Sequence, residues 1–531
     1  MSINFATSLV QLCESSGLEM NVHLAFKEKP TRQKQKIITL SKYVQKYPEG
    51  WKKRLELANF LYEMGDWQQA VAEYHQVLER QPQLVGMRLQ LGKMLQIMRR
   101  EKEAVEIYEK ALFCFDNEGT QHHIKGLMAV GRHESQKAII AFNLATRLEP
   151  DKIVHWLALA QVHQQIENHL GVLSALEQVL SIHPDDVVAL IYSHDASQAV
   201  GDMTAARGQL SKVIALVPND FRVLQRLIEQ RCQMRLVSGI EGKLTKKMIT
   251  SLLLQAPHGA EAHKSLAYYH ILRGDWRQGV EVLAEFTAEH PHQPYGWYYY
   301  GRSLFETGEY QKAAQMMGKA YQLYPNDCEI YRALCEILPA AKRLEELRPV
   351  VEEMLKRFPQ RWSVLATAGR VLVEHFKEIE RGCSVSEQGT KLQPQLADAW
   401  FRHGRVLAWA LKHREAVEAL EKGWELLPAG GYLQSVPAAL WLGESYRVLG
   451  DVGASQRWWK LAGEGCQELR AFNPAMADYW LGRALVGLRD KLGAIQAFES
   501  ALSQQLLYPA RGEVEKTLPG LKGKGRKISR S

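Results

Sequence analysis

The sequence lacks the patterns that mark a membrane span, a secreted protein or a disulfide-bonded domain. No window reaches 18 uninterrupted apolar residues, so no spanning helix is expected. The apolar segment from Ile3 to Cys13 contains polar residues and has no basic residue before it, unlike a secretory signal. The seven cysteines are scattered, odd in number and include no CxxC pair, which argues against disulfides and a structural zinc site. We therefore expect a cytoplasmic protein with reduced, buried cysteines.

Catalytic motifs are missing as well. There is no HExxH, no GxSxG, no P-loop and no dinucleotide fingerprint after a strand, and no segment has a convincing strand pattern. The histidine pairs at positions 122 and 123 and at 290 and 292 do not share a helix face, so exposed or capping histidines are expected rather than metal ligands. These absences predict a chain with no enzymatic activity, no cofactor and no metal.

Basic and acidic residues are nearly equal in number over most of the chain. There are 67 Lys and Arg residues against 59 Asp and Glu residues, a net charge of +8. Residues 510–531 hold seven basic and two acidic residues, so five of the eight net charges lie there. A basic nucleic-acid-binding body is therefore not expected. The remaining possibility is a short, flexible, basic tail that binds nucleic acid or an anionic surface without specificity.

What the sequence has in abundance is a 34-residue period. It is marked by the prolines Pro48, Pro82, Pro150, Pro184, Pro218, Pro257, Pro291, Pro325, Pro359, Pro394, Pro428, Pro474 and Pro509. With Asp116 standing at one missing proline, nine of the thirteen steps are 34 residues and two are 35. The longer steps, after Pro218 and after Pro428, locate insertions of about 5 and about 12 residues.

Within each unit the apolar residues are three and four apart, which predicts two short helices joined near a central glycine and ended by the proline. The clearest copy contains Trp297, Gly301, Leu304, Gly308, Tyr310, Ala313, Ala320 and Pro325. Small residues allow close approach of neighbouring helices, and glycine in the turn accepts left-handed dihedral angles. A periodic helical array follows, rather than several independent domains.

This pattern resembles the tetratricopeptide repeat family, over about thirteen units from residue 49 to residue 509. The pentatricopeptide class, which reads RNA, is a weaker match because its period is 35 and it lacks the early tryptophan and closing proline. The resemblance implies an all-α fold, an α-solenoid in which helix-turn-helix units stack into a right-handed superhelix.

The same pattern predicts the organisation of the chain. We expect a divergent helical cap over residues 1–48, five units over 49–236, an irregular insert and unit end over 237–256 that serves as hinge or boundary, further units over 257–509, and a basic, disordered tail over 510–531. The second helix near Arg381 to Ser386 is expected to be disturbed.

The resemblance also implies where a partner would bind. In such arrays the first helix of each unit lines a concave groove, and its positions two, five, nine and twelve share one stripe. Applied to this chain, with the neighbouring Trp409, the candidate groove residues are Lys264, Tyr268, Tyr295, Tyr298, Arg302, Phe305, Arg332, Arg370, Phe401, Arg405 and Trp409. Arginines there could grip a partner's carboxylates while rings supply contact area. The alternative is that the arginines pair with carboxylates of the chain itself, such as Glu306 and Glu336.

Three functions remain open on this basis. The first is a scaffold or adaptor that holds a peptide or helix of a protein partner in the groove. The second is binding of nucleic acid or an anionic surface through the basic tail. The third is a regulatory array for an enzyme on another chain. The oligomeric state and the partner's identity are not predicted.

Overall fold

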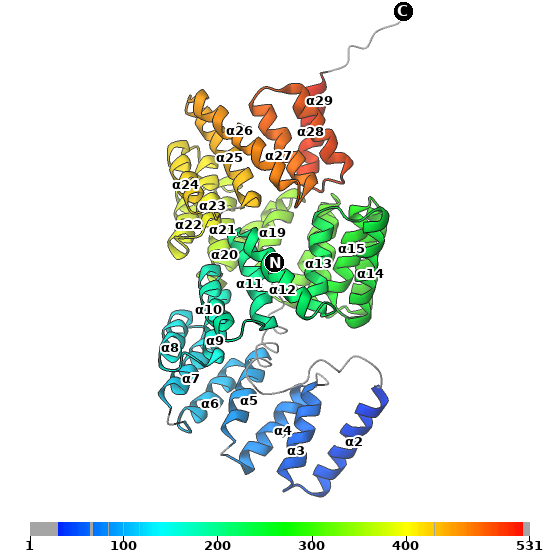
Figure 1. The fold of residues 1–531 in the computed structure, drawn as a ribbon, viewed down its shortest axis with the longest axis vertical. Helices are drawn as coiled ribbons and strands as arrows, with labels where there is room; N and C mark the ends of the chain where they lie inside the picture. The colour runs from blue at the N-terminus through cyan, green and yellow to red at the C-terminus, as the bar shows by residue number, and fades with distance from the viewer. Residues whose placement is uncertain are drawn as a thin grey trace, which may run out of the picture. The chain divides into compact units, whose positions relative to one another are not determined.

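The structure is a computed structural model that describes residues 30–63, 67–82, 84–98, 100–115, 117–428 and 431–523. All regular secondary structure in these residues is helical, with 28 helices and no strand (Figure 1). The all-α solenoid predicted from the period is confirmed. No helix in the described part of the chain is long and apolar enough to cross a membrane.

Twenty-six of the helices form thirteen consecutive hairpins, the number that the proline series predicts. The first helices of the hairpins are α3 (Trp51–Glu63), α5 (Val85–Ile97), α7 (Glu118–Gly131), α9 (Ile153–Gln165), α11 (Val187–Val200), α13 (Phe221–Gln233), α15 (Ala260–Leu272), α17 (Pro294–Glu306), α19 (Cys328–Ala340), α21 (Trp362–Glu374), α23 (Ala397–Trp409), α25 (Tyr432–Val448) and α27 (Pro474–Gly487). The second helices are α4 (Trp67–Arg80), α6 (Glu101–Leu112), α8 (Ser135–Leu148), α10 (His169–Ile182), α12 (Met203–Leu216), α14 (Gly239–Gln255), α16 (Trp276–Glu289), α18 (Tyr310–Leu323), α20 (Leu344–Arg357), α22 (Ile379–Leu392), α24 (His413–Glu425), α26 (Val452–Leu469) and α28 (Lys491–Ser503).

One helix precedes the hairpins and one follows them. Helix α2 (Pro30–Lys46) lies in the expected amino-terminal cap, whose earlier residues are outside the described part. Helix α29 (Ala510–Lys522) occupies most of the segment expected to be a disordered tail, and that expectation is wrong for these residues. Val514 and Leu518 are buried against the last hairpin, and Lys522 lies 2.6 Å from Glu499. Residues 524–531 of the predicted tail lie outside the described part.

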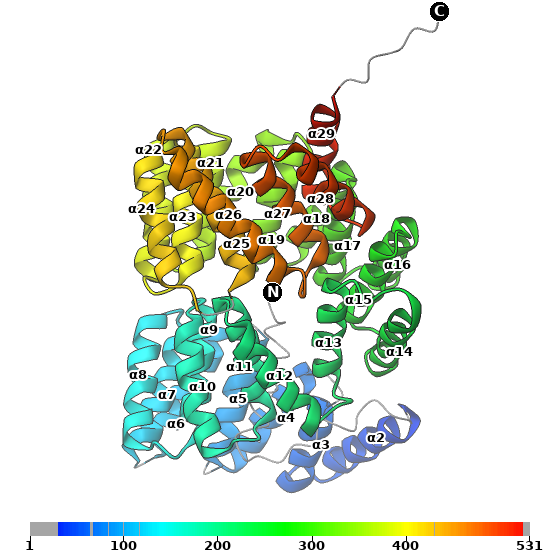
Figure 2. The ribbon, with the colours of Figure 1, turned by 45° about the horizontal axis from the view of Figure 1, so that its top comes forward.

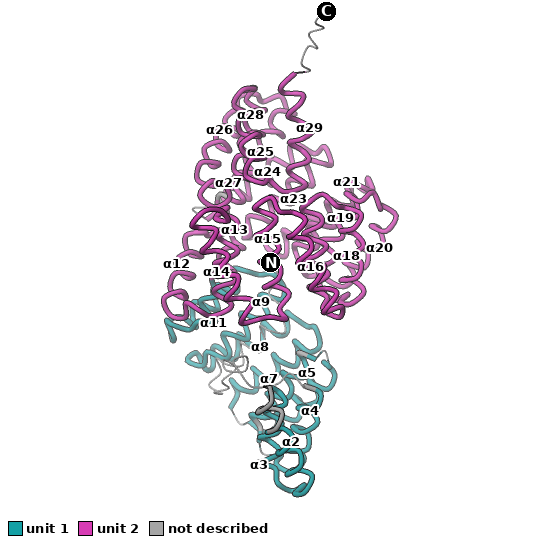
Figure 3. Tube along the Cα trace, turned by 90° about the vertical axis from the view of Figure 1, so that its right-hand side faces the viewer, with its two compact units in different colours: residues 1–193 teal, residues 194–531 magenta. Residues whose placement is uncertain are grey.

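The chain divides into two compact units, residues 1–193 and residues 194–531, hereafter unit 1 and unit 2 (Figure 3). The division falls within α11 and not at residues 237–256, where the sequence predicted an irregular insert. The extra residues there lengthen α14 to 17 residues instead. Thr245 is fully buried, and its hydroxyl donates to the carbonyl of Leu236 at 2.7 Å, which ties the lengthened helix to its own hairpin turn.

Two further expectations about local structure are corrected. Helix α22 runs without interruption through Arg381 to Ser386 because small residues there let it lie against α21. A Cβ atom at Gly369 would be 2.7 Å from the carbonyl oxygen of Gly382. His123 is buried rather than exposed, and its Nδ1 lies 3.1 Å from Nδ1 of His155.

The cysteines behave as the sequence predicts, with one exception. Among the described cysteines only Cys114 is exposed. Burial raises the pKa of Cys232, Cys335 and Cys466 to about 12, so these thiols stay protonated and unreactive.

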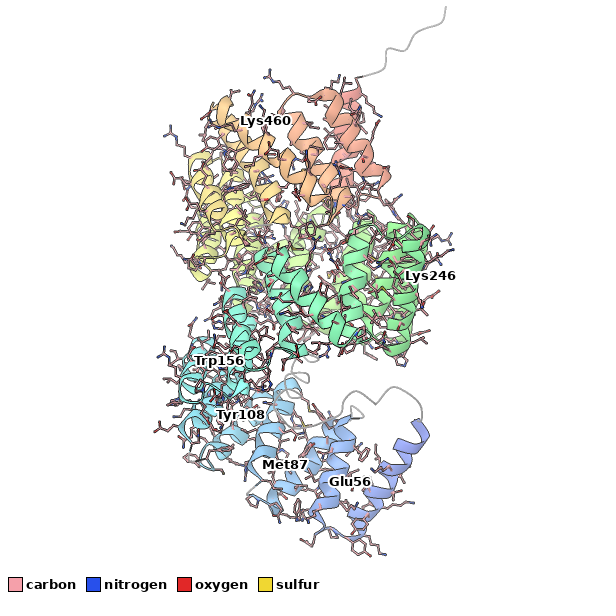
Figure 4. All side chains as sticks on the ribbon, in the orientation of Figure 1. Glu56, Met87, Tyr108, Trp156, Lys246 and Lys460 are labelled. Carbon is pink, nitrogen blue, oxygen red and sulfur yellow. The ribbon has the colours of Figure 1, made fainter. Side chains whose placement is uncertain are left out.

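Glycine on the first helix of several hairpins makes room for an aromatic ring on the second. A Cβ atom would lie 2.3 Å from Tyr108 if placed at Gly92, and 2.5 Å from Phe498 if placed at Gly482. Both rings are almost fully buried, and Tyr108 can be located in Figure 4. Since these close approaches recur along the chain, the small residue of the sequence pattern has a packing role in these hairpins.

Tryptophan at the fourth position of three first helices ties its unit to the preceding one. In each case the indole Nε1 donates a hydrogen bond to the carbonyl oxygen of the proline six residues earlier. The pairs are Trp156 and Pro150 (2.8 Å), Trp297 and Pro291 (2.9 Å), and Trp400 and Pro394 (2.9 Å). Each bond therefore joins the first helix of a unit to the loop that follows the second helix of the unit before it.

Each hairpin turn from α7/α8 onward contains at least one residue with positive φ. In some turns it is glycine, as at Gly450 (φ 87°), and in others it is not, as at Lys342 (φ 57°). A non-glycine residue in this region costs about 1–2 kcal/mol, of which about 0.5–1 kcal/mol is offset by lower entropy of the unfolded chain.

We therefore expect Lys342→Gly to raise the free energy of unfolding by about 0.5–1 kcal/mol, and Gly450→Ala to lower it by a similar amount. No atom lies within 4 Å of a Cβ placed at Gly450, so that change tests the backbone alone. Urea denaturation of both variants provides the measurement. Destabilisation by Lys342→Gly would contradict the explanation.

Unit 2 curls until its last hairpins contact its first ones. The contacts include Gln434 Nε2 to the Ala199 carbonyl (3.2 Å), Arg235 Nε to the Gln504 carbonyl (2.9 Å) and Tyr508 N to the Glu306 carbonyl (3.1 Å). The ring of Tyr508 also packs edge-on against Trp276 and Tyr310. Figure 2 shows the last helices beside α17 and α18. This contact region is called the closure below.

Candidate functional site

The candidate groove residues lie on the first helices of unit 2, which contact one another in sequence from α13 to α27. Position nine of these helices forms a column of polar residues. Its members are Asp195, Glu229, Tyr268, Arg302, Glu336, Arg370 and Arg405, spaced by 34 to 39 residues along the chain. Of the predicted groove residues, Tyr268, Arg302, Arg370 and Arg405 thus share one position on successive first helices.

The arginines of this column pair with carboxylates of the chain itself. Arg302 Nη1 lies 2.7 Å from Glu336 of the next first helix, and Nη2 lies 3.7 Å from Glu306. Arg405 pairs with Glu444 at 2.9 Å. The Arg302–Glu336 and Arg405–Glu444 pairs link neighbouring first helices, and pairing of the arginines within the chain is the alternative that the sequence left open.

The electrostatics of these pairs follow from their burial and charge. Burial opposes ionisation of Glu336, but the charge of Arg302 and the hydrogen bond it donates outweigh burial and hold the pKa of Glu336 below its usual range. Burial is stronger at Glu306, where it raises the pKa although Arg302 opposes it. An incoming carboxylate would thus compete with Glu336, which is already ionised and bound.

Two other predicted arginines are also engaged. Arg332 Nη1 lies 2.6 Å from Glu329, one turn earlier on α19. Arg370 lies 3.0 Å from Glu374, and its other terminal nitrogen donates to the Cys335 carbonyl at 3.4 Å.

Arg405 has a second set of contacts, with aromatic rings. Its guanidinium lies 4.6 Å from the ring centre of Trp409 and 5.2 Å from that of Trp441. Trp409 was a predicted groove residue, whereas Trp441 and Glu444 were not. Both lie on α25, outside the helices to which the positional rule was applied.

Two of the predicted groove residues belong to the core. Phe305 is 4% exposed and packs with Leu304 and Ala313, and Phe401 is 1% exposed and packs with Leu420. The expectation that these two rings face a partner is corrected, because each packs against the second helix of its own hairpin.

Three tyrosines on α15 and α17 are only partly buried. Tyr268, Tyr298 and Tyr299 are half-buried, and the rings of Tyr298 and Tyr299 are 5.3 Å apart. Within the described residues none of their three hydroxyls forms a hydrogen bond. Lys264 stands 5.4 Å from the ring centre of Tyr299 and 4.0 Å from Glu229. These three tyrosines are called the tyrosine cluster below.

The tyrosine cluster consists of neutral hydrogen-bonding groups. Burial raises the pKa of Tyr268, Tyr298 and Tyr299, so the hydroxyls stay protonated at physiological pH. Tyr295, also a predicted groove residue, differs because its hydroxyl donates to Asp327 at 2.5 Å. Tyr299 was missed by the positional rule, although the run from Tyr298 to Tyr300 is a visible signal in the sequence.

A family profile described as "Tetratricopeptide repeat" matches residues 55–118 and 264–327. These matches fall on the same hairpins that the 34-residue period defines. The chain contains tetratricopeptide repeats. The second match includes α15 and α17, so the tyrosine cluster lies on recognised tetratricopeptide units.

Individual relatives of this tetratricopeptide array are distant. The Protein CTR9 homolog of Arabidopsis thaliana is 23% identical over 377 residues, which are 68% of this chain. The chain spans about a third of the length of that relative, 33%. The solved APC/C hetero-tetramer Cut9–Hcn1 aligns with 97% of this chain and 98% of its own at 12% identity and a TM-score of 0.46. Yeast Tom70 aligns with 76% of this chain and 96% of its own at 14% identity and a TM-score of 0.39.

Proposed function

We propose that this tetratricopeptide protein is a non-catalytic scaffold that holds an extended peptide or a helix of a partner protein against the tyrosine cluster of unit 2. The observation that carries the proposal is the set of three half-buried rings whose hydroxyls have no hydrogen bond within the described residues. Tyrosine offers a large contact area at low entropic cost together with a hydrogen-bonding group, and it is enriched where proteins bind one another.

Because the arginines pair within the chain, a partner that binds mainly through carboxylates is disfavoured. Since Arg302, Arg370 and Arg405 are bound to carboxylates or carbonyls of the chain, a partner gains little by offering them carboxylates. A peptide whose backbone carbonyls and amides meet the tyrosine hydroxyls fits better. In this proposal the arginines hold the first helices in place and the tyrosines make the contact.

The test uses photo-crosslinking in the full chain. A p-benzoylphenylalanine residue at position 298 should crosslink a partner protein in cells that produce this chain, and one at position 268 should crosslink the same protein. Position 300 is the matched control, because Tyr300 lies about 200° away on the same helix and packs against Trp297. Crosslinking that is strongest at position 300 would contradict the proposal.

A second measurement separates contact from folding. Tyr298→Phe with Tyr299→Phe keeps both rings and removes two hydroxyls, and we expect about a thirtyfold loss of affinity for the crosslinked partner, from about 1 kcal/mol per hydrogen bond. Tyr300→Phe should leave affinity unchanged. Unaltered binding by the double variant would show that the hydroxyls do not contact the partner.

A further inference from the structure

A second surface of unit 2 is formed by the turns between the two helices of each hairpin. Because stacked hairpins share one orientation, these turns line the same edge of the array. Along the first hairpins of unit 2 this edge is covered by the closure. Besides the hydrogen bonds of the closure, Arg207 lies 3.9 Å from the ring centre of Phe472, and Arg511 lies 5.0 Å from that of Trp276.

The same edge is uncovered at the last three hairpins. Their turns, between α23 and α24, α25 and α26, and α27 and α28, carry six exposed apolar side chains. These are Leu411 (80% exposed), Val448 (64%), Leu449 (42%), Val452 (56%), Val486 (40%) and Leu492 (75%), called the turn patch below. A group of large apolar residues exposed on neighbouring elements marks an interaction surface.

The charged residues around the turn patch are mainly basic. Arg447, Arg489 and Lys491 are exposed, and none of them has an ion pair within the residues that the structure describes. The acidic residues beside them, Asp451 and Asp490, cap helices: their carboxylates accept from Ala454 N at 2.8 Å and from Gly493 N at 2.9 Å. Because helix N-termini offset those two charges, the patch presents net positive charge to a ligand.

The closure shows what kind of segment fits this edge. At α15 to α18 the covering residues are the apolar Leu507, the aromatic Tyr508 and Arg511 at the start of α29, whose guanidinium lies over the ring of Trp276. The covering segment is thus an apolar turn followed by the first turn of a helix. The ring of Tyr508 packs over Gly308, where a Cβ atom would lie 3.1 Å from that ring.

We propose that the turn patch docks an acidic amphipathic helix of a partner protein, which covers the last three hairpin turns as residues 504–511 cover the earlier ones. A second copy fits less well, because the patch would meet its own cations. The chain's own residues 504–511 are already placed at the closure and contain no acidic side chain to pair with these cations. This surface is separate from the tyrosine cluster, so either proposal can fail without the other.

The test uses the full chain and a defined probe. The probe is a 16-residue fluorescent helical peptide with leucines four residues apart and glutamates beside them, and a second peptide has lysine in place of glutamate. We expect the acidic peptide to bind at least tenfold more tightly than the basic one. Leu411→Asn with Leu492→Gln should reduce that binding at least tenfold, since asparagine also tolerates the left-handed dihedral angles of position 411.

The controls distinguish the other occupants. Ile240→Asn with Leu254→Gln removes two apolar side chains of similar exposure (85% and 77%) elsewhere on unit 2 and should leave binding unchanged. Equal binding of both peptides, or binding unaffected by the patch variant, would overturn the proposal. So would co-sedimentation with phosphatidylserine vesicles, or a dimer seen by sedimentation velocity, that the patch variant abolishes.

Discussion

Acidification from pH 7.5 to pH 4.5 is expected to lower the free energy of unfolding of this protein by several kcal/mol. The cause is a set of histidines that burial keeps neutral. Burial lowers the pKa of His75, His123, His155, His163, His194, His270, His375 and His403. They are distributed over both units, so both should lose stability.

His403 gives the size of the effect. It is 8% exposed, its Nδ1 lies 2.8 Å from the Ser386 hydroxyl, and burial lowers its pKa to about 4. The unfolded chain has a histidine pKa of about 6.5, so between pH 6.5 and pH 4 the unfolded state binds a proton that the folded state does not. Stability therefore falls as the pH falls through this window, by about 3 kcal/mol for His403 alone.

Urea denaturation followed by circular dichroism between pH 4.5 and pH 7.5 measures this dependence. His403→Gln can keep a hydrogen bond to Ser386 and removes the titrating group, so its stability should fall less steeply with acid. His292→Gln is the control because His292 is exposed on the surface. A flat profile for the natural sequence would contradict the explanation.

Gly482→Ala should destabilise the last hairpin by about 3 kcal/mol, the upper range for overpacking a core. A Cβ atom at Gly482 would lie 2.5 Å from the ring of Phe498, which is 2% exposed and has no room to move away. Alanine normally favours a helix over glycine by about 1 kcal/mol, so a loss would come from the collision alone.

A smaller side chain at position 498 should relieve the collision with the Cβ atom of Gly482→Ala. We expect Gly482→Ala with Phe498→Leu to be more stable than Gly482→Ala alone, as measured by amide hydrogen exchange in α27 and α28. Gly318→Ala is the matched control, since it lies within α18 and no atom is within 4 Å of its Cβ position. It should gain up to about 1 kcal/mol. Equal losses at both glycines would contradict the packing explanation.

The hairpins could be predicted from the sequence because each depends on residues close to one another in the chain. The proline period gave their number, and the helical spacing selected Tyr268 and Tyr298 as groove candidates. Hairpin geometry is repeated locally, so its signals are also repeated. Whether these residues contact a partner stays a prediction.

The remaining features depend on contacts between distant parts of the chain. Nothing near Arg235 indicates that it donates to the carbonyl of Gln504, 269 residues later. The ordered helix α29 was missed for the same reason, since its composition suggested a tail and its burial comes from the last hairpin. The burial of Phe401 depends on how α23 is rotated about its axis against α24. A rule that counts positions along one helix does not include this rotation.

The closure changes how unit 2 should respond to force. In an open array each repeat contacts only its neighbours. Under force such an array can lengthen gradually, and its repeats can unfold one at a time from either end. In unit 2 the Gln434 to Ala199 bond spans 235 residues, so pulling on its ends first loads the closure. Contacts of such high sequence separation also slow folding, since a long loop must close before they form. Unit 2 should therefore extend in a single abrupt step once the closure breaks, rather than unit by unit.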